Sequence, residues 1–465
     1  MTGADRRQAL LTRLAELPPE QRDALHASLL RRPRERTWPL TRQQEQFWYI
    51  NQFAKDPAGS SYHIPWCVRL RGPIDQEALA TALTRIVERH HTLRVRFRLV
   101  DDRLVQVLMP PEPVPLPLLD VADEEEAALA AFIDRPFDLE NDPPLRAALL
   151  RLADDEAVLC VVLHHIVADA WSLNILLREM AECYTARWEG REPDLPELPI
   201  QFPDFAAEDG RRDHSAALEH WTRTLAGSVP LDLPIDRPRP PRWTGHADEE
   251  HFRISEEAVV RLEEAARRER GTLFTAMVTA YQVALGLLAG QDDVCVGVPT
   301  VGRARTELEP LIGCFSTVIV MRADLSGDPA FRELHRRTRV ALLRGLQYPD
   351  MPWERLFESL GRARDLSRPS LYQVMFNLLN VPGDDRSRTT MADLEIEFFQ
   401  PRRRYTHSEL DALTVRDPVG LGGVFIYNRD QFSAATVRRF IAAFMGVVVR
   451  AGADPDLRIS QMKGH

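Results

Sequence analysis

A proline-rich segment, residues 189–242, divides the chain into two stretches that each alternate strand-like and helix-like patterns. The whole chain has 465 residues, which is longer than one hydrophobic core usually supports. Strand patterns are scarce inside the proline-rich segment, as is typical of a connection between lobes. We therefore predict an α/β protein with mixed sheets, built from an N-terminal lobe (1–188), a connection (189–242) and a C-terminal lobe (243–465).

Both predicted lobes contain helices and strands. In the first lobe, Asp75 is placed to cap a helix that runs to Arg89, and residues 158–163 form an apolar strand. Residues 1–38 are predicted as a helical lead-in, because leucines alternate with charged residues there. The most apolar segment, residues 273–289, is interrupted by threonine, tyrosine and glutamine, so we predict a buried helix and no membrane span.

The charge balance and the cysteines exclude several classes of protein. The chain has 59 basic and 69 acidic residues, a net charge of −10, so it lacks the basic excess that nucleic-acid binding needs. Its five cysteines are widely spaced and form no CxxC pair, which argues against a disulfide framework or a zinc site. The N-terminus carries no apolar signal-peptide core. These features predict a cytoplasmic protein that binds neither nucleic acid nor a membrane.

The segment from Val161 to Ser172 contains the residues best suited to chemistry. His164 and His165 end a buried apolar strand, and Asp169 follows four residues after the second histidine. Imidazole exchanges protons near neutral pH, so a histidine at a strand end suits proton abstraction. An isolated pair of this kind is more often two core histidines bonded to backbone. Metal binding is disfavoured, because adjacent residues on a strand point to opposite faces.

Seven segments, in order along the chain, resemble the motifs of the condensation domain family of nonribosomal peptide synthetases. The segment His164-His-Ile-Val-Ala-Asp-Ala170 resembles the HHxxxDG signature of that family, with alanine in place of glycine. Any one motif would be a weak signal, but their order over about 330 residues is specific. The other six are Leu40 to Trp48, Arg89 to Phe97, Ile200 to Ala206, Leu311 to Phe315, Tyr348 to Glu354 and Arg364 to Ser370.

The resemblance implies a fold, a reaction and partners. The fold is two chloramphenicol-acetyltransferase-like lobes arranged as a V, with the active site in a tunnel that donor and acceptor enter from opposite faces. The reaction joins an acyl or aminoacyl thioester, held on the 4'-phosphopantetheine of a peptidyl carrier protein, to an amine or alcohol acceptor that is free or carrier-bound. No metal and no cofactor bound by the chain itself are expected.

The resemblance also assigns roles to residues. His165 is the catalytic histidine, either as general base or as the group that orients the nucleophile, and His164 accompanies it. Asp169 is chiefly structural and pairs with an arginine, which by position is Arg303. The same aspartate is also placed to cap the helix that begins near Trp171. Backbone amides after His165 are expected to receive the oxyanion.

Further residues are expected around the tunnel. An active-site asparagine is expected at the end of an apolar strand in the second lobe, and it is either Asn380 or Asn377; the alternative is a strand-end asparagine bonded to backbone. Ser316-Thr317-Val318 departs from the Val-Asn-Thr of the family at the tunnel floor. The alanine after Asp169 is tolerated if that position is helical and strained if its φ is positive. The residues expected to line the tunnel are Ala170, Trp171, Ser316 and Thr317, although Trp171 also fits a core.

Several functions stay open at this point. With Met1 at its start and no adenylation or carrier segment, the chain reads as a free-standing enzyme, similar to the ester-forming condensation enzymes of enediyne antibiotic pathways, or else as an excised domain. Ala170 and Ser316 would suit a non-peptidyl acceptor. The alternatives are an epimerase of the same superfamily, a coenzyme-A-dependent acyltransferase, and a non-catalytic recruitment module. The intact pair His164-His165 argues against the last.

Overall fold

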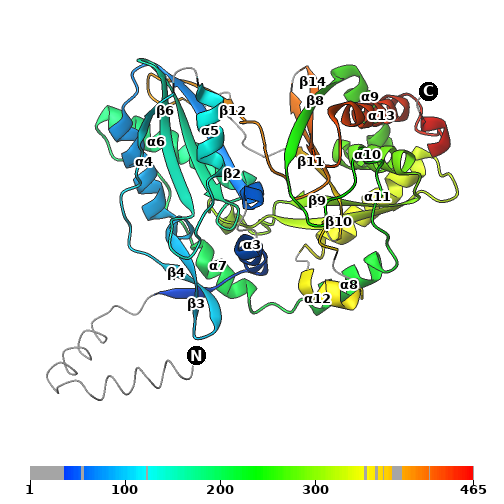
Figure 1. Cartoon of the computed structure of the whole chain (residues 1–465), viewed down its shortest axis with the longest axis horizontal. Coiled ribbons are helices and arrows are strands. Elements are labelled where there is room, and N and C mark those ends of the chain that lie inside the picture. Colours follow the sequence, from blue (N-terminus) through cyan, green and yellow to red (C-terminus); the bar gives the residue numbers. More distant parts are fainter. Residues whose placement is uncertain are drawn as a thin grey trace.

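Two lobes lie side by side in the computed structural model, and their ribbons diverge toward one end of the molecule (Figure 1). Each lobe has a mixed sheet, neither sheet closes into a barrel, and each lobe has its own hydrophobic core. The predicted two-lobe α/β fold is confirmed. The structure describes residues 36–53, 57–121, 124–349, 353–361, 365–369, 371–379, 390–417 and 419–463.

A five-stranded sheet, in the order β12-β2-β7-β6-β5, forms the centre of the N-terminal lobe. All its strand pairs are antiparallel except β5 with β6. In the central strand β7 every residue from Ala157 to His164 is buried, which accounts for its apolar sequence. The strands are β2 (His63–Arg71), β5 (Leu118–Asp120), β6 (Leu145–Ala153), β7 (Glu156–His164) and β12 (Glu395–Phe399).

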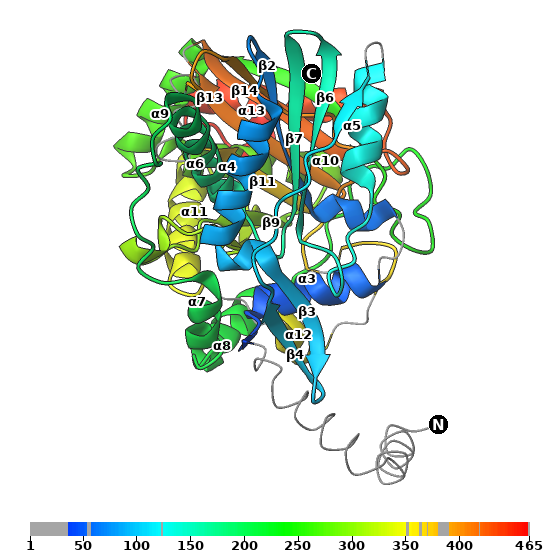
Figure 2. The same ribbon diagram turned by 90° about the vertical axis from the view of Figure 1, so that its left-hand side faces the viewer.

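Helices cover both faces of this sheet (Figures 1 and 2). Helices α4 (Gln76–Arg89) and α6 (Ala170–Glu189) pack together on one face, and α5 (Glu125–Asp134) lies on the other. The Asp75 carboxylate accepts from Ala78 N at the start of α4, as expected of a cap. Shorter helical segments complete the lobe, namely α3 (Arg42–Phe53), η1 (Pro57–Tyr62), η2 (His91–Arg94) and α7 (Phe202–Asp209).

A small sheet of β1 (Thr37–Pro39), β4 (Arg103–Leu108) and β3 (Val95–Val100) begins the described chain. The prediction of a helical lead-in to residue 38 is therefore wrong at its end, where Thr37 and Trp38 pair with β4 as a strand. Most of that predicted lead-in, residues 1–35, lies outside the described residues.

A six-stranded sheet, in the order β10-β9-β11-β13-β14-β8, forms the C-terminal lobe. Its helices pack on one face, so the opposite face of the sheet is turned toward the N-terminal lobe (Figure 1). The strands are β8 (Ala247–Ser255), β9 (Asp293–Thr300), β10 (Thr317–Asp324), β11 (Val374–Leu379), β13 (Leu410–Asp417) and β14 (Gly420–Asn428). The helices are α9 (Glu256–Arg268), α10 (Leu273–Ala289), α11 (Phe331–Leu346) and α13 (Ala434–Ala453), with η4 (Thr306–Leu308) and η5 (Ile459–Met462).

Two segments from the second half of the chain return to the N-terminal lobe. Strand β12 pairs with β2 as an edge strand, with Ile396 opposite Leu70. The buried side chains of Leu308, Leu311 and Phe315 belong to the hydrophobic core of the N-terminal lobe. The lobes are therefore interlocked through their sheets and cores as well as through the connection.

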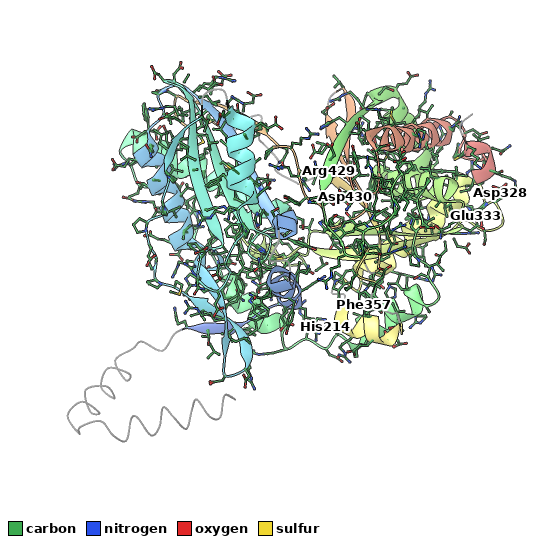
Figure 3. The ribbon with its side chains drawn as sticks, viewed as in Figure 1. His214, Asp328, Glu333, Phe357, Arg429 and Asp430 are labelled. Atoms are coloured by element: carbon green, nitrogen blue, oxygen red, sulfur yellow. The ribbon has the colours of Figure 1, made fainter. Side chains whose placement is uncertain are left out.

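The connection itself contains two helices. Besides α7, it holds α8 (Ser215–Leu225), which packs against α12 (Trp353–Ser359). His214 lies on this connection at the bottom of the molecule, whereas Arg429 and Asp430 lie higher, where the C-terminal lobe faces the N-terminal lobe (Figure 3). Among the described residues no single helix is long and apolar enough to cross a membrane. The pair α9 and α10 meets that test only jointly and is bent by 104°.

Candidate active site

Strand β7 delivers the two histidines to the junction between the lobes. Strand β7 ends at His164, and the backbone N–H of His165 donates to Tyr62 O at 2.9 Å beside the start of β2. His164 is 1% exposed and packs against the rings of His63 and Phe137. His165, the next residue, points to the other side and remains partly exposed. This alternation gives the two histidines different surroundings.

His164 is a buried neutral histidine. Its Nδ1 accepts a hydrogen bond from the backbone N–H of Ile166 at 3.1 Å. Burial lowers the pKa of His164 well below the usual value, and the neighbouring His63 acts in the same direction. His164 therefore has a structural role in the turn after β7.

His165 is held between an aromatic ring and a thiol. Its ring stacks on Phe47 of α3 at 4.8 Å between centroids, and its Nδ1 lies 4.0 Å from the Sγ of Cys314. Burial lowers the pKa of His165, and the negative charge of Asp169 opposes that shift. The imidazole is therefore neutral at neutral pH and able to accept a proton.

A buried ion pair joins the loop after β7 to the C-terminal lobe. Arg303 donates from Nη1 to Asp169 Oδ2 at 2.7 Å and from Nη2 to Oδ1 at 3.1 Å. The side chains are 1% and 3% exposed. The same carboxylate accepts from Phe315 N and Ser316 N, so one aspartate holds the loop 302–316 of the second lobe. Arg303 is the arginine that the resemblance assigned to Asp169.

Asp169 also begins helix α6. Its Oδ1 accepts from Ser172 N at 2.9 Å, and Ser172 Oγ donates to the same atom at 2.8 Å. The capping role and the ion pair thus coexist on one carboxylate. Ala170 is the first residue of the helix, so alanine carries no positive-φ strain where the family has glycine.

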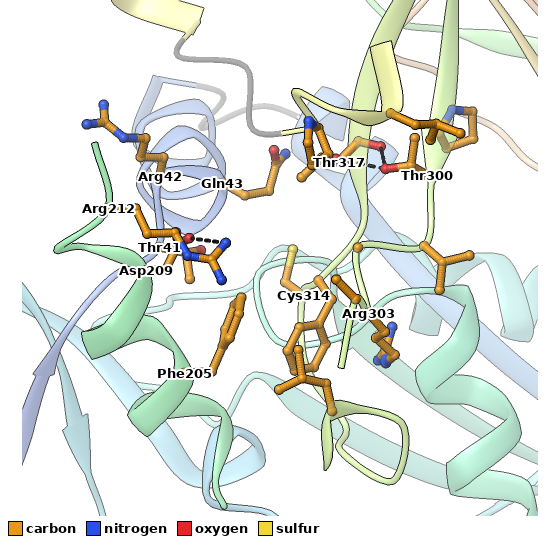
Figure 4. A pocket seen from close by; sticks show the side chains of 18 of the residues that line it. Thr41, Arg42, Gln43, Phe205, Asp209, Arg212, Thr300, Arg303, Cys314 and Thr317 are labelled. Carbon is orange, nitrogen blue, oxygen red and sulfur yellow. Dashed lines mark hydrogen bonds and ion pairs between the residues drawn. The ribbon is translucent and has the colours of Figure 1, made fainter. Parts of the chain in front are cut away.

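A cavity of about 560 Å³ opens from the surface toward His165 between the lobes. Figure 4 shows side chains of α3 and α7 facing Thr300, Thr317 and Cys314 across it. His165 itself does not line this cavity, but Cys314, which touches its ring, does. Arg303 and Thr317 line it as well, whereas Ala170, Trp171 and Ser316 are not among its lining residues.

Trp171 packs at the edge of the N-terminal core. Its Nε1 donates to Glu309 O at 2.9 Å, and the Arg303 guanidinium lies 5.6 Å from its ring centroid. The tryptophan therefore supports the ion pair from the side. This position agrees better with the prediction that Trp171 packs in a core than with the prediction that it lines the tunnel.

Of the two candidate asparagines, Asn377 lies within the described residues. Asn377 lies in β11 opposite Leu413, and it shares the lobe-facing side of the sheet with Met375, because Val374 and Phe376 are in the core. Its backbone carbonyl accepts from Thr414 Oγ1. Asn380 lies outside the described residues.

The backbone amides just after His165 are already engaged. The N–H groups of His165, Ile166 and Val167 donate to Tyr62 O, His164 Nδ1 and His164 O respectively. Of the amides that follow His165, those of Ile166 and Val167 therefore already have acceptors within the turn.

Sequence patterns missed several residues around His165. Cys314 lies within the motif Leu311 to Phe315, but that motif does not indicate its contact with His165. Phe47, Tyr62 and His407 form a chain of rings, with centroid distances of 5.1 Å from Phe47 to Tyr62 and 5.5 Å from Tyr62 to His407. No local pattern marks His407, because it reaches the site only through the packing of one lobe on the other. Within the described part of the chain, no cluster of three or more His, Cys, Asp or Glu could hold a metal.

Comparisons with known proteins agree with this geometry. The family described as Condensation domain matches residues 34–464. Chondramide synthase cmdD of Chondromyces crocatus is 35% identical over 463 residues, which are 97% of this chain and 11% of that protein. Malpinin synthetase of Mortierella alpina is 33% identical over 426 residues, which are 88% of this chain and 5% of that protein. The chain thus spans only a small part of the length of these relatives.

Solved structures of similar proteins share the two-lobe fold. The X-domain from teicoplanin biosynthesis is 27% identical with a TM-score of 0.81, and the match covers 93% of this chain and 98% of that one. The SgcC5 protein from Streptomyces globisporus is 27% identical with a TM-score of 0.74, covering 90% of this chain and all of that chain (100%).

Proposed function

The chain belongs to the condensation domain family, and we propose that it joins an acyl thioester delivered by a carrier protein to an amine or alcohol acceptor. Members of this family form amide or ester bonds by acyl transfer. The observation that carries the proposal is the neutral, partly exposed His165, held at the junction of the lobes beside a cavity that reaches the surface.

The proposed reaction needs few groups from the protein. A thioester is already activated, so the acceptor attacks its carbonyl carbon directly while His165 takes the acceptor's proton. The carbon–sulfur bond then breaks, and the departing thiolate receives that proton. Holding both reactants in one orientation contributes roughly 7–11 kcal/mol in favourable cases, and a general base contributes about 10²–10⁴-fold. Asp169 and Arg303 fix the loop after His165 and thereby its position.

An alcohol acceptor should depend on His165 more than an amine acceptor does. A neutral amine can attack before it loses a proton, whereas an alcohol must lose its proton as it attacks. The proposal is tested by offering acyl and aminoacyl carrier proteins in parallel to amine and alcohol acceptors and identifying products by mass spectrometry. Product formation that disappears in His165→Ala, with an unchanged thermal melt, supports it. If His165→Ala turned over as fast as the unaltered protein, the mechanism would be contradicted.

A second function is favoured by one comparison. Among the similar structures is a complex of the X-domain and OxyB from teicoplanin biosynthesis, 28% identical with a TM-score of 0.81. This chain would then be a recruitment module that binds another enzyme and transfers no acyl group. The same assay separates the two functions, because a recruitment module forms no product above the level of the His165→Ala variant.

A further inference from the structure

A second group of polar residues lies beside His165 but outside the lining of the cavity. His407 of the C-terminal lobe stacks on Tyr62 of the N-terminal lobe at 5.5 Å with an interplanar angle of 23°. The backbone oxygen of Tyr62 accepts the N–H of His165. Tyr62 therefore contacts both His407 and the backbone of His165, although His407 and His165 belong to different lobes.

The register of the C-terminal sheet places Asp411 in the same group. In β13, Leu410 and Ala412 point into the core, so Asp411 points to the face turned toward the N-terminal lobe. It pairs in register with Met375 of β11, whose Sδ lies 3.0 Å from the Nε2 of His407. Both Asp411 and His407 are partly exposed.

Within the described part of the chain, the hydrogen bonds of these two side chains leave acceptor positions open. A thioether sulfur only accepts, so His407 donates from Nε2–H to Met375 and keeps the lone pair on Nδ1. Burial lowers the pKa of His407, while the nearby Asp411 charge opposes that shift, so the ring is neutral. The Asp411 carboxylate accepts from Thr406 Oγ1 at 3.2 Å and from Ser408 Oγ. A carboxylate has about four acceptor positions, so the described residues leave roughly two of them unfilled.

We propose that His407 and Asp411 form a subsite that binds a protonated amino group on the acyl donor, close to its thioester carbonyl. An ammonium group carries three donors and a positive charge, which matches an imidazole lone pair and a carboxylate. The subsite would select aminoacyl donors over simple acyl donors. This inference rests on the proposed function, since it assumes that a carrier-bound thioester reaches His165.

Binding of stable donor analogues tests the subsite without needing turnover. The probes are the alanyl, lactyl and propionyl amides of aminopantetheine, in which an amide replaces the thioester, titrated by calorimetry into the whole chain. The unaltered protein should bind the alanyl amide at least tenfold more tightly than the propionyl amide, with the lactyl amide close to propionyl. In Asp411→Asn this preference should fall to within about twofold, with propionyl affinity unchanged.

Two further variants guard against a folding artefact. His407→Phe keeps the stacking on Tyr62 and removes both ring nitrogens, so it should also reduce the alanyl preference while its thermal melt stays the same. Asp417→Asn is the matched control, because Asp417 lies on the same strand but pairs with Arg253 away from the site, and it should keep the full preference.

The outcomes separate the subsite from the proposed function. Equal binding of all three probes by the unaltered protein, or an alanyl preference that survives in both Asp411→Asn and His407→Phe, overturns the subsite alone. Equal tight binding of the lactyl and alanyl amides also overturns it, because charge would then play no part. If none of the three probes binds, delivery of the donor by a pantetheine arm is contradicted. The subsite is then overturned as well, because it rests on that delivery.

Discussion

Arg303 Nη1 lies 2.7 Å from Asp169 Oδ2, and this pair ties the loop that follows His165 to the opposite lobe. Four further groups donate to the carboxylate, namely Ser172 N, Ser172 Oγ, Phe315 N and Ser316 N. A carboxylate with this many partners fixes the position of α6 relative to the loop of the second lobe. Changes at the pair should therefore affect stability and catalysis together.

Removing either partner of the pair should destabilise the fold strongly. Asp169→Ala or Arg303→Ala leaves an uncompensated buried charge, which typically costs about 3–5 kcal/mol. Urea unfolding followed by fluorescence measures the effect. Arg261→Ala is the control, because its ion pair with Glu257 is exposed and should change stability by less than about 1 kcal/mol. Similar losses in the control and the pair variants would contradict a special role for the pair.

Gly302 should tolerate no side chain. Its φ is +69°, and a Cβ placed there would lie 1.8 Å from Phe315 O, inside the loop that Asp169 holds. Gly302→Ala should therefore cost more than the roughly 1–2 kcal/mol of left-handed strain alone and should lower turnover. Gly327→Ala is the matched comparison, because its φ is +77° with no atom within 4 Å of the added Cβ. Equal shifts in the thermal melts of the two variants would show that the contact with Phe315 is unimportant.

The sequence predicts much of the architecture because burial leaves clear periodic patterns. Helices α9 and α10 begin and end where their apolar faces and caps indicate. Strand β8 was missed because it lies at the edge of its sheet and alternates acidic residues with few apolar ones. Strand β12 was missed because its partner β2 lies more than 300 residues earlier in the chain.

The site could be predicted only where its residues are neighbours in sequence. His164, His165 and Asp169 fall within one short segment, so their proximity is local. The positions of Cys314 and His407 depend on how the two lobes pack, and hydrophobic periodicity in the sequence does not indicate that packing. Only the family resemblance predicts Arg303, since nothing in its local sequence links it to Asp169.

The alanine that departs from the family signature should have little effect on function. Ala170 begins α6 with helical backbone, and its side chain is exposed. Ala170→Gly should lower stability by no more than about 1 kcal/mol, because glycine has the greater entropy loss in a helix. Turnover with a fixed donor and acceptor should stay within about twofold. A large gain in turnover would instead show that the methyl group obstructs a reactant.

Stability should fall as the pH is lowered below 6.5. Burial lowers the pKa of His63 to about 4, and burial also lowers the pKa of His164. Between pH 6.5 and 5 the unfolded chain takes up protons at these positions that the folded chain does not. Each such proton lowers the free energy of unfolding by about 1.4 kcal/mol per pH unit. His63→Gln should make the decline shallower, whereas His251→Gln, at an exposed position on β8, should leave its slope unchanged.

The pH dependence of turnover should identify His165 as the proton acceptor. Burial lowers the pKa of His165 below its ordinary value of 6.5, so the neutral imidazole persists to lower pH than in a solvent-exposed histidine. With an alcohol acceptor, kcat/KM should be constant from neutral pH to below pH 6.5 and should then fall as the imidazole gains a proton. His165→Gln should lose about 10²–10⁴-fold in rate and also lose this acidic limb. A limb that survives in His165→Gln would assign the proton transfer to another group.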